Sequence, residues 1–173
     1  MVMHIYASIV FFLFMKPLAV IGQDAVSFFD QGYIQYDEGN YEEAILLYNR
    51  AIEIDSKNAS YYYYRGVSKS MLLLNNESIA DFDKALEFDP EFGEVFFERA
   101  FSYYRMSENE KAISNYDKAI ELLPDFGPAY LNRGSVKFDI DDMDGACLDW
   151  EKAVMLDMEI ARELLNEYCP SKS

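Results

Sequence analysis

Histidine is nearly absent from this chain: one of its 173 residues is histidine, His4, and two are cysteine. We expect His4 to leave with an N-terminal leader, so that the working protein carries no imidazole. Nucleophilic catalysis of the Ser-His-Asp or Cys-His kind and histidine-ligated zinc sites are then excluded. The sequence also lacks a glycine-rich phosphate loop, a nucleophile motif and a paired metal motif. We therefore expect no enzymatic activity, no cofactor and no metal.

Positive charge is scarce as well. The chain has 15 Lys and Arg against 31 Asp and Glu, a net charge of −16. Because such a chain repels phosphate backbones and anionic lipid, nucleic acid is not an expected partner. Glycine and proline are few, with 8 and 5 residues, whereas 51% of the residues are hydrophobic. That composition excludes disordered and collagen-like chains, and the length suits a single domain.

Residues 1–22 have the pattern of a secretory signal peptide. The apolar run Ile5–Met15 is shorter than the roughly 20 residues of a bilayer span. Val20 and Gly22 are small enough for the −3 and −1 positions of a cleavage site. The sequence thus predicts an exported protein, periplasmic or secreted, without stable membrane insertion after cleavage. Because no Lys or Arg precedes the apolar run, an uncleaved segment that tethers the protein to a membrane is the alternative, and a buried N-terminal helix is a third.

The chain repeats itself with a period of 34 residues. Two aligned columns hold small residues and two hold aromatic residues in every copy: Gly32, Gly66, Ala100 and Gly134; Ala51, Ala85, Ala119 and Ala153; Phe28, Tyr62, Phe96 and Tyr130; and Tyr48, Phe82, Tyr116 and Trp150. Agreement across this many columns without a gap is not expected by chance.

Each copy is predicted to be a helix–turn–helix. Phe28 and Gly32 lie four residues apart, as do Ala44 and Tyr48, so each pair shares one helical face. A turn signal, Glu38–Asn40, separates the two stretches. Because a single helix pair cannot bury its apolar side, four units are expected to stack into a solenoid. The units span residues 25–58, 59–92, 93–126 and 127–160.

This pattern resembles the tetratricopeptide repeat family. The first unit carries the family's residues at the expected positions: Gly32, Gly39, Tyr41, Ala44, Tyr48 and Ala51. The resemblance implies an all-α fold, a right-handed superhelical solenoid of antiparallel helix pairs whose first helices line a concave surface. One departure is consistent, because the Leu expected before the first small column is replaced in every unit: Gln31, Arg65, Arg99 and Arg133.

The first helices implied by this resemblance carry an aromatic set at their inward positions. Helical spacing selects a predicted partner-binding groove: Phe29, Tyr33, Tyr36, Tyr63, Phe97, Phe101, Tyr104, Arg105 and Phe138. Exposed aromatic surface of this extent usually marks a binding site. The alternative is that a tight superhelix buries these side chains against one another. The Lys, Asn and Arg with which family members clamp a partner's C-terminal carboxylate are missing from these positions.

The expected function is therefore that of a non-enzymatic protein-interaction module. Its groove would hold an extended peptide or a partner's helix, in an adaptor or assembly role in an exported compartment. Two alternatives belong to other classes: a structural subunit of an envelope complex that stacks through the ends of the solenoid, and a groove that binds carbohydrate or another small ligand.

Arginine recurs at the 34-residue period in units two to four. Each of these arginines is accompanied by an acceptor just before the second aromatic column: Asp81, Asn115 and Asp149. The first unit has neither, since Gln31 and Leu47 occupy the two positions. We interpret the arginines as structural links between the two helices of a unit rather than as an anion-binding track.

Residues 161–173 are predicted to form a capping helix and a short tail. The stretch Ile160–Tyr168 has apolar side chains at core spacing and would cover the last unit. Cys147 and Cys169 lie eleven residues before and after Met158, at a turn, so antiparallel helices would bring them level. In an exported protein this favours a disulfide. Two separate buried thiols are the alternative.

Overall fold

The computed structural model describes residues 24–169, and the predicted leader at residues 1–22 lies outside this range. Within it the regular structure is helical throughout: α1 (Ala25–Asp37), α2 (Tyr41–Ile54), α3 (Ala59–Met71), α4 (Asn75–Phe88), α5 (Gly93–Arg105), α6 (Asn109–Leu122), α7 (Gly127–Asp139), α8 (Met143–Met155) and α9 (Glu159–Tyr168).

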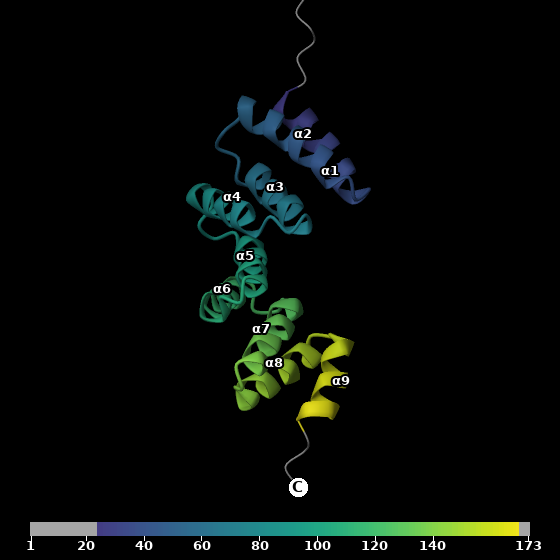
Figure 1. The fold of residues 1–173 in the computed structure, drawn as a ribbon, viewed down its shortest axis with the longest axis vertical. Helices are drawn as coiled ribbons and strands as arrows, with labels where there is room; N and C mark the ends of the chain where they lie inside the picture. The colour runs from purple at the N-terminus through teal and green to yellow at the C-terminus, as the bar shows by residue number, and fades with distance from the viewer. Residues whose placement is uncertain (1–23, 170–173) are drawn as a thin grey trace, which may run out of the picture.

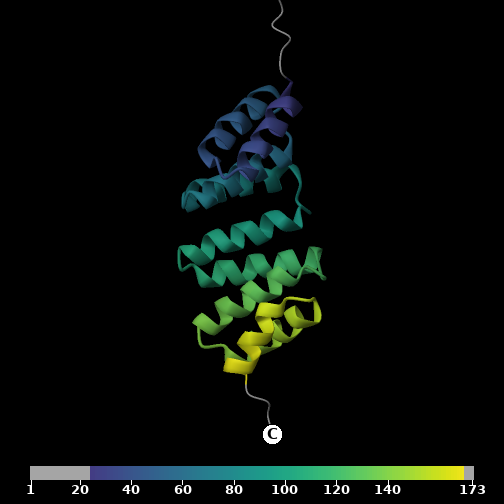
Figure 2. The same cartoon turned by 90° about the vertical axis from the view of Figure 1, so that its right-hand side faces the viewer.

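The helices pack as four hairpins, α1 with α2 through α7 with α8, and each hairpin lies within one 34-residue unit. The hairpins follow one another along the long axis of the molecule, as successive layers (Figures 1 and 2). Each second helix contacts the first helix of the next hairpin, and α9 packs on α8 at the C-terminal end. The predicted all-α solenoid is confirmed.

Small residues on the first helices make room for aromatic rings of the second helices. A Cβ added to Gly66 would lie 2.7 Å from Phe82 Cε1, and one added to Gly134 would lie 2.7 Å from Trp150 Cδ1. Phe82 and Trp150 are buried, at 0% and 1% exposure. The first small column and the second aromatic column of the sequence therefore meet in the cores of these hairpins.

The three recurrent arginines link the two helices of their hairpins, as predicted. Each donates from Nε to its acceptor: Arg65 to Asp81 Oδ2 at 2.9 Å, Arg99 to Asn115 Oδ1 at 2.8 Å, and Arg133 to Asp149 Oδ2 at 2.9 Å. The Asp side chains are 6% exposed. Buried carboxylates are thus neutralised by charge-assisted hydrogen bonds.

The same arginines also join successive hairpins, which the sequence did not predict. Each donates from Nη1 to the second helix of the preceding unit: Arg65 to Asn49 Oδ1 at 2.7 Å, Arg99 to Asp83 Oδ1 at 2.5 Å, and Arg133 to Asp117 Oδ1 at 2.5 Å. One guanidinium thereby connects three helices. The arginines thus tie neighbouring hairpins together along the solenoid.

The C-terminal helix α9 begins at Glu159, two residues before the predicted boundary at residue 161. Met158 is its N-cap residue, directly after a turn in which Asp157 has a positive φ of 63°. Ala161 is fully buried and packs with Trp150. The helix covers α8 from its first turn onward, so its start is set by this contact.

Candidate partner-binding groove

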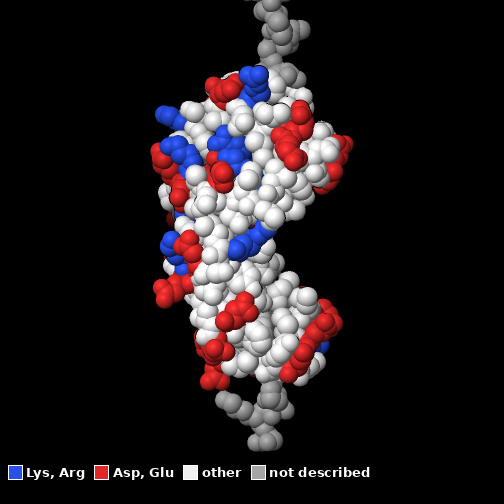
Figure 3. Space-filling view, viewed as in Figure 1, with Lys and Arg blue, Asp and Glu red and all other residues white. Residues whose placement is uncertain are grey.

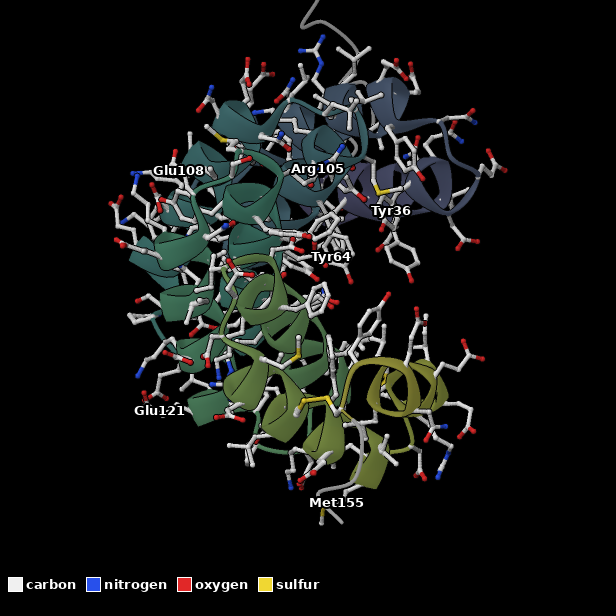
Figure 4. The ribbon with its side chains drawn as sticks, turned by 60° about the horizontal axis from the view of Figure 1, so that its bottom comes forward. Tyr36, Tyr64, Arg105, Glu108, Glu121 and Met155 are labelled. Carbon is white, nitrogen blue, oxygen red and sulfur yellow. A yellow bond between two sulfur atoms is a disulfide. The ribbon has the colours of Figure 1, made fainter. Side chains whose placement is uncertain are left out.

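The first helices border a hollow on one side of the solenoid. In Figure 3 the molecule narrows at mid-height, and uncharged side chains cover most of the recessed surface there. Figure 4 shows Tyr36 and Tyr64 pointing into the open space, whereas Glu108, Glu121 and Met155 lie at the outer surface. The hollow is the candidate groove.

An aromatic cluster from α1 and α3 forms the N-terminal wall of this groove. Tyr64 lies at its centre, with ring centroids 5.4 Å from Tyr33, 6.3 Å from Tyr36 and 5.3 Å from Phe29. Tyr33 is 46% exposed, and Tyr36 and Tyr64 are half-buried. We call Tyr33, Tyr36 and Tyr64 the tyrosine cluster. It presents ring faces and hydroxyls together.

Tyr64 was not among the residues predicted for the groove. Its column in the 34-residue repeat holds Asp30, Tyr64, Glu98 and Asn132, of which none is aliphatic. On a helix whose other columns hold core residues, a column that is polar or aromatic in every unit is the signal that could have identified Tyr64.

Four of the predicted groove residues pack against the core of their own hairpins. Each partly buried ring lies close to the aromatic residue of the second helix: Phe29 to Tyr48 at 5.8 Å, Tyr63 to Phe82 at 6.4 Å, Phe97 to Tyr116 at 5.7 Å, and Phe138 to Trp150 at 5.7 Å between ring centroids. These side chains form the floor of the groove and support it.

Two of the three remaining predicted residues, Tyr104 and Arg105, connect successive first helices, and the third, Phe101, packs against Arg105. Arg105 donates from Nη1 to the carbonyl oxygen of Ser70 on α3 at 2.9 Å, and its Cζ lies 5.5 Å from the ring centroid of Phe101. Tyr104 donates its hydroxyl to Asp139 Oδ2 on α7 at 2.6 Å. The positive charge predicted for the groove is therefore already engaged within the fold.

Glu98 on α5 is a second groove residue that sequence reasoning missed. Burial raises the pKa of its carboxyl to about 7. Burial and then the Glu98 charge raise the pKa of both Tyr36 and Tyr63, which places the carboxylate beside residues of α1 and α3. Burial is the main cause of the raised pKa values of Tyr63 and Tyr64. Glu94, one turn before Glu98 on α5, makes a smaller contribution to both shifts.

Tyr48 carries a hydroxyl that is buried without a hydrogen-bond partner among the described residues. Its ring lies 6.2 Å from that of Tyr64, and burial raises the pKa of its hydroxyl. An unpaired buried hydroxyl costs stability. The core of the first hairpin thus holds an unpaired hydroxyl group close to Tyr64 of the groove wall.

Cys147 and Cys169 form a pair between α8 and the end of α9, with Cα atoms 5.9 Å apart, a separation that a disulfide spans. Within residues 24–169, the acidic and sulfur side chains form no group of three or more that could hold a metal ion. None of the helices described is long and apolar enough to cross a membrane.

Two segments match family models of the tetratricopeptide repeat, residues 32–70 (TPR repeat) and residues 93–126 (Tetratricopeptide repeat). The first segment runs from the second half of α1 through α2 and nearly all of α3, and the second segment is the third unit. No curated protein sequence matches the chain.

Solved structures with this fold include MamA and domains of RPAP3. A crystal structure of MamA has a TM-score of 0.74 at 23% identity, over 81% of this chain and 82% of that chain. MamA from Desulfovibrio magneticus RS-1 has a TM-score of 0.74 at 16% identity, over 80% and 78%. The second domain of human RPAP3, in complex with an HSP70 peptide, has a TM-score of 0.63 at 25% identity, over 65% and 94%. The chain thus contains segments that match the tetratricopeptide repeat, and its fold is that of tetratricopeptide repeat solenoids.

Proposed function

We propose that this protein is a non-catalytic interaction module that holds an extended peptide in its concave groove. The observation that carries the proposal is the tyrosine cluster, whose rings lie on one open wall with Tyr33 46% exposed. Tyrosine rings pack on apolar side chains while their hydroxyls bond to peptide backbone. The first helices contact one another in sequence, α1 to α3, α3 to α5 and α5 to α7, and so offer a continuous track.

Structural neighbours support a peptide as the occupant. The first repeat domain of Spaghetti (RPAP3) is solved with the HSP90 peptide SRMEEVD, and the second domain of human RPAP3 with the HSP70 peptide SGPTIEEVD. Both peptides carry acidic residues near the C-terminus. The groove of this chain carries Glu94 and Glu98 instead of free cations, so we expect its peptide to have a different charge.

Selection of short random peptides displayed on phage tests this proposal. We expect the purified protein to enrich a set of peptides. The triple variant Tyr33→Ala, Tyr36→Ala, Tyr64→Ala should bind these peptides more than about tenfold more weakly than the wild type does, because each truncated aromatic hot spot costs about 2 kcal/mol. The matched control is Leu46→Ala with Leu148→Ala, at exposed positions on the second helices α2 and α8. Fluorescence anisotropy with synthetic copies of the peptides gives the affinities.

Equal affinity of the wild type and the triple variant would contradict the proposal. If the wild type self-associates in sedimentation experiments and the triple variant does so equally, the alternative of a structural subunit would be favoured instead. Far-ultraviolet circular dichroism of each variant shows that the helical fold is intact.

We also propose that the protein works in an oxidising exported compartment after removal of residues 1–22. The leader pattern and the Cys147–Cys169 pair support this. The oxidised pair closes a loop across a sequence separation of 22 residues, for which loop entropy predicts about 3 kcal/mol of stability.

Reduction with dithiothreitol should therefore lower the free energy of unfolding by about 3 kcal/mol in urea denaturation. Cys147→Ser with Cys169→Ser should show the same loss and no further response to the reductant. Alkylation of two free thiols in the protein secreted by its own host, read by mass spectrometry, would contradict the disulfide.

A further inference from the structure

Glu94 and Glu98 lie on α5 among aromatic residues from several other helices. The Glu98 charge acts on hydroxyls of α1, α3 and α6, those of Tyr36, Tyr63 and Tyr116. Glu94 acts on Tyr63 and Tyr64 of α3. Glu98 also holds on α5 the repeat position that Tyr64 holds on α3, and α3 contacts α5. The two carboxylates therefore lie next to the tyrosines of α3, one helical turn apart on a single helix.

Neither carboxylate has a cation of its own. Among residues 24–169, none of the ion pairs involves Glu94 or Glu98. Arg99, the next residue along α5, pairs with Asp83 on the outer side, and Arg105 is bound to the Ser70 carbonyl. By contrast, the buried Asp81 has both Arg65 and Lys69. The fold neutralises this buried carboxylate and leaves the two carboxylates in the groove without a cation.

Tyrosine rings around such a carboxylate complete a site for a cation. Tyr63 and Tyr64 lie edge to face with ring centroids 4.9 Å apart, and Tyr64 continues into the tyrosine cluster. Ring faces attract ammonium and guanidinium groups, most strongly where water is excluded. A carboxylate beside them supplies the counter-charge that a desolvated cation needs.

We propose that the groove recognises a Lys or Arg side chain of the bound peptide, with its cation seated between Glu98 and the rings of Tyr36, Tyr63 and Tyr64. This rests on the proposed function and specifies its partner as a basic extended peptide. Charge complementarity supports this occupant, since the chain has a net charge of −16 and the groove cation Arg105 is engaged internally. An acidic peptide would meet two unneutralised carboxylates at the same place.

The peptides recovered from the phage selection are the probe. We expect them to share a Lys or Arg at one fixed position, and replacement of that residue by norleucine to weaken binding to the wild type about tenfold, the effect of losing one partly desolvated charge pair. In the Glu98→Gln variant the Lys and norleucine peptides should bind alike. Glu110→Gln, the same charge change at an exposed position on α6, is the matched control and should keep the tenfold preference.

The pH dependence separates recognition by Glu98 from general attraction to an acidic protein. The pKa of Glu98 near 7 means that its charge is lost as the pH falls from 8 to 6, so affinity for the Lys peptide should fall about tenfold over this range. The facing hydroxyls of Tyr36, Tyr63 and Tyr116 stay protonated, because their pKa values are raised. The Glu98→Gln variant should show a flat profile.

The outcomes distinguish the two proposals. Peptides that depend on the tyrosine cluster but carry no fixed basic residue would overturn the cation site and leave the peptide groove standing. A basic preference that Glu98→Gln and Glu110→Gln both retain would also overturn it, as non-specific attraction. If no recovered peptide depends on the tyrosine cluster, the peptide groove and the cation site both fail.

Discussion

Arg133→Ala should lower the free energy of unfolding by about 3 kcal/mol, because it removes the bidentate partner of a buried carboxylate. Arg133 donates from Nε and Nη2 to Asp149 at 2.9 and 2.5 Å, and the Asp149 side chain is 6% exposed. Lys137 remains at 2.8 Å and limits the loss. The variant also cuts the link to Asp117, so the last two hairpins should separate more easily.

Arg50→Ala is the matched control for this loss. Arg50 pairs with Glu53 on one exposed helix face, where both side chains are more than 60% exposed. Its removal should change the free energy of unfolding by less than about 0.5 kcal/mol, as for other exposed pairs. Urea denaturation followed by circular dichroism measures both. If Arg133→Ala unfolded at the wild-type midpoint but failed to bind a ligand, the arginines would be a binding track.

Phe82→Ala should cost about 4 kcal/mol, the usual price of removing a fully buried aromatic ring. Phe82 is 0% exposed and rests on the Gly66 backbone, so its loss leaves a cavity between α3 and α4 that glycine cannot fill. Because these helices belong to an inner hairpin, the contacts to both neighbouring units weaken as well.

Two further variants calibrate this effect. Phe82→Tyr should be tolerated much better than Phe82→Ala, because the same column holds Tyr48 and Tyr116 in other hairpins. Leu46→Ala, at an exposed position on α2, should change stability by less than about 0.5 kcal/mol. Chemical denaturation gives the three values. A loss for Phe82→Ala no greater than that for Leu46→Ala would contradict the assigned hairpin core.

The hairpins were predictable because their contacts repeat along the sequence. Gly66 and Phe82 are 16 residues apart, as are Arg65 and Asp81, and both pairings recur in other units at the same offset. Interactions between two helices joined by a short turn are fixed by helical spacing alone. For the same reason the arginine links could be read from the acceptors that accompany them.

The groove was less predictable, because it depends on distances between units. The angle between hairpins decides which rings are open. Tyr33 is exposed, whereas Tyr63 packs on Phe92 with ring centroids 5.0 Å apart. Glu98 faces tyrosines of the two preceding units, at 35 and 62 residues' separation. No spacing within one repeat reveals such contacts, so only the folded structure shows that Tyr64 and Glu98 lie close to tyrosines of other units.

The most direct test of the peptide groove is the affinity of one selected peptide for the wild type and for the Tyr33→Ala, Tyr36→Ala, Tyr64→Ala variant. Fluorescence anisotropy should give a dissociation constant more than about tenfold higher for the variant, with the helical circular dichroism of the two proteins unchanged. Equal dissociation constants would show that the concave tyrosines do not hold the peptide, and would contradict the account.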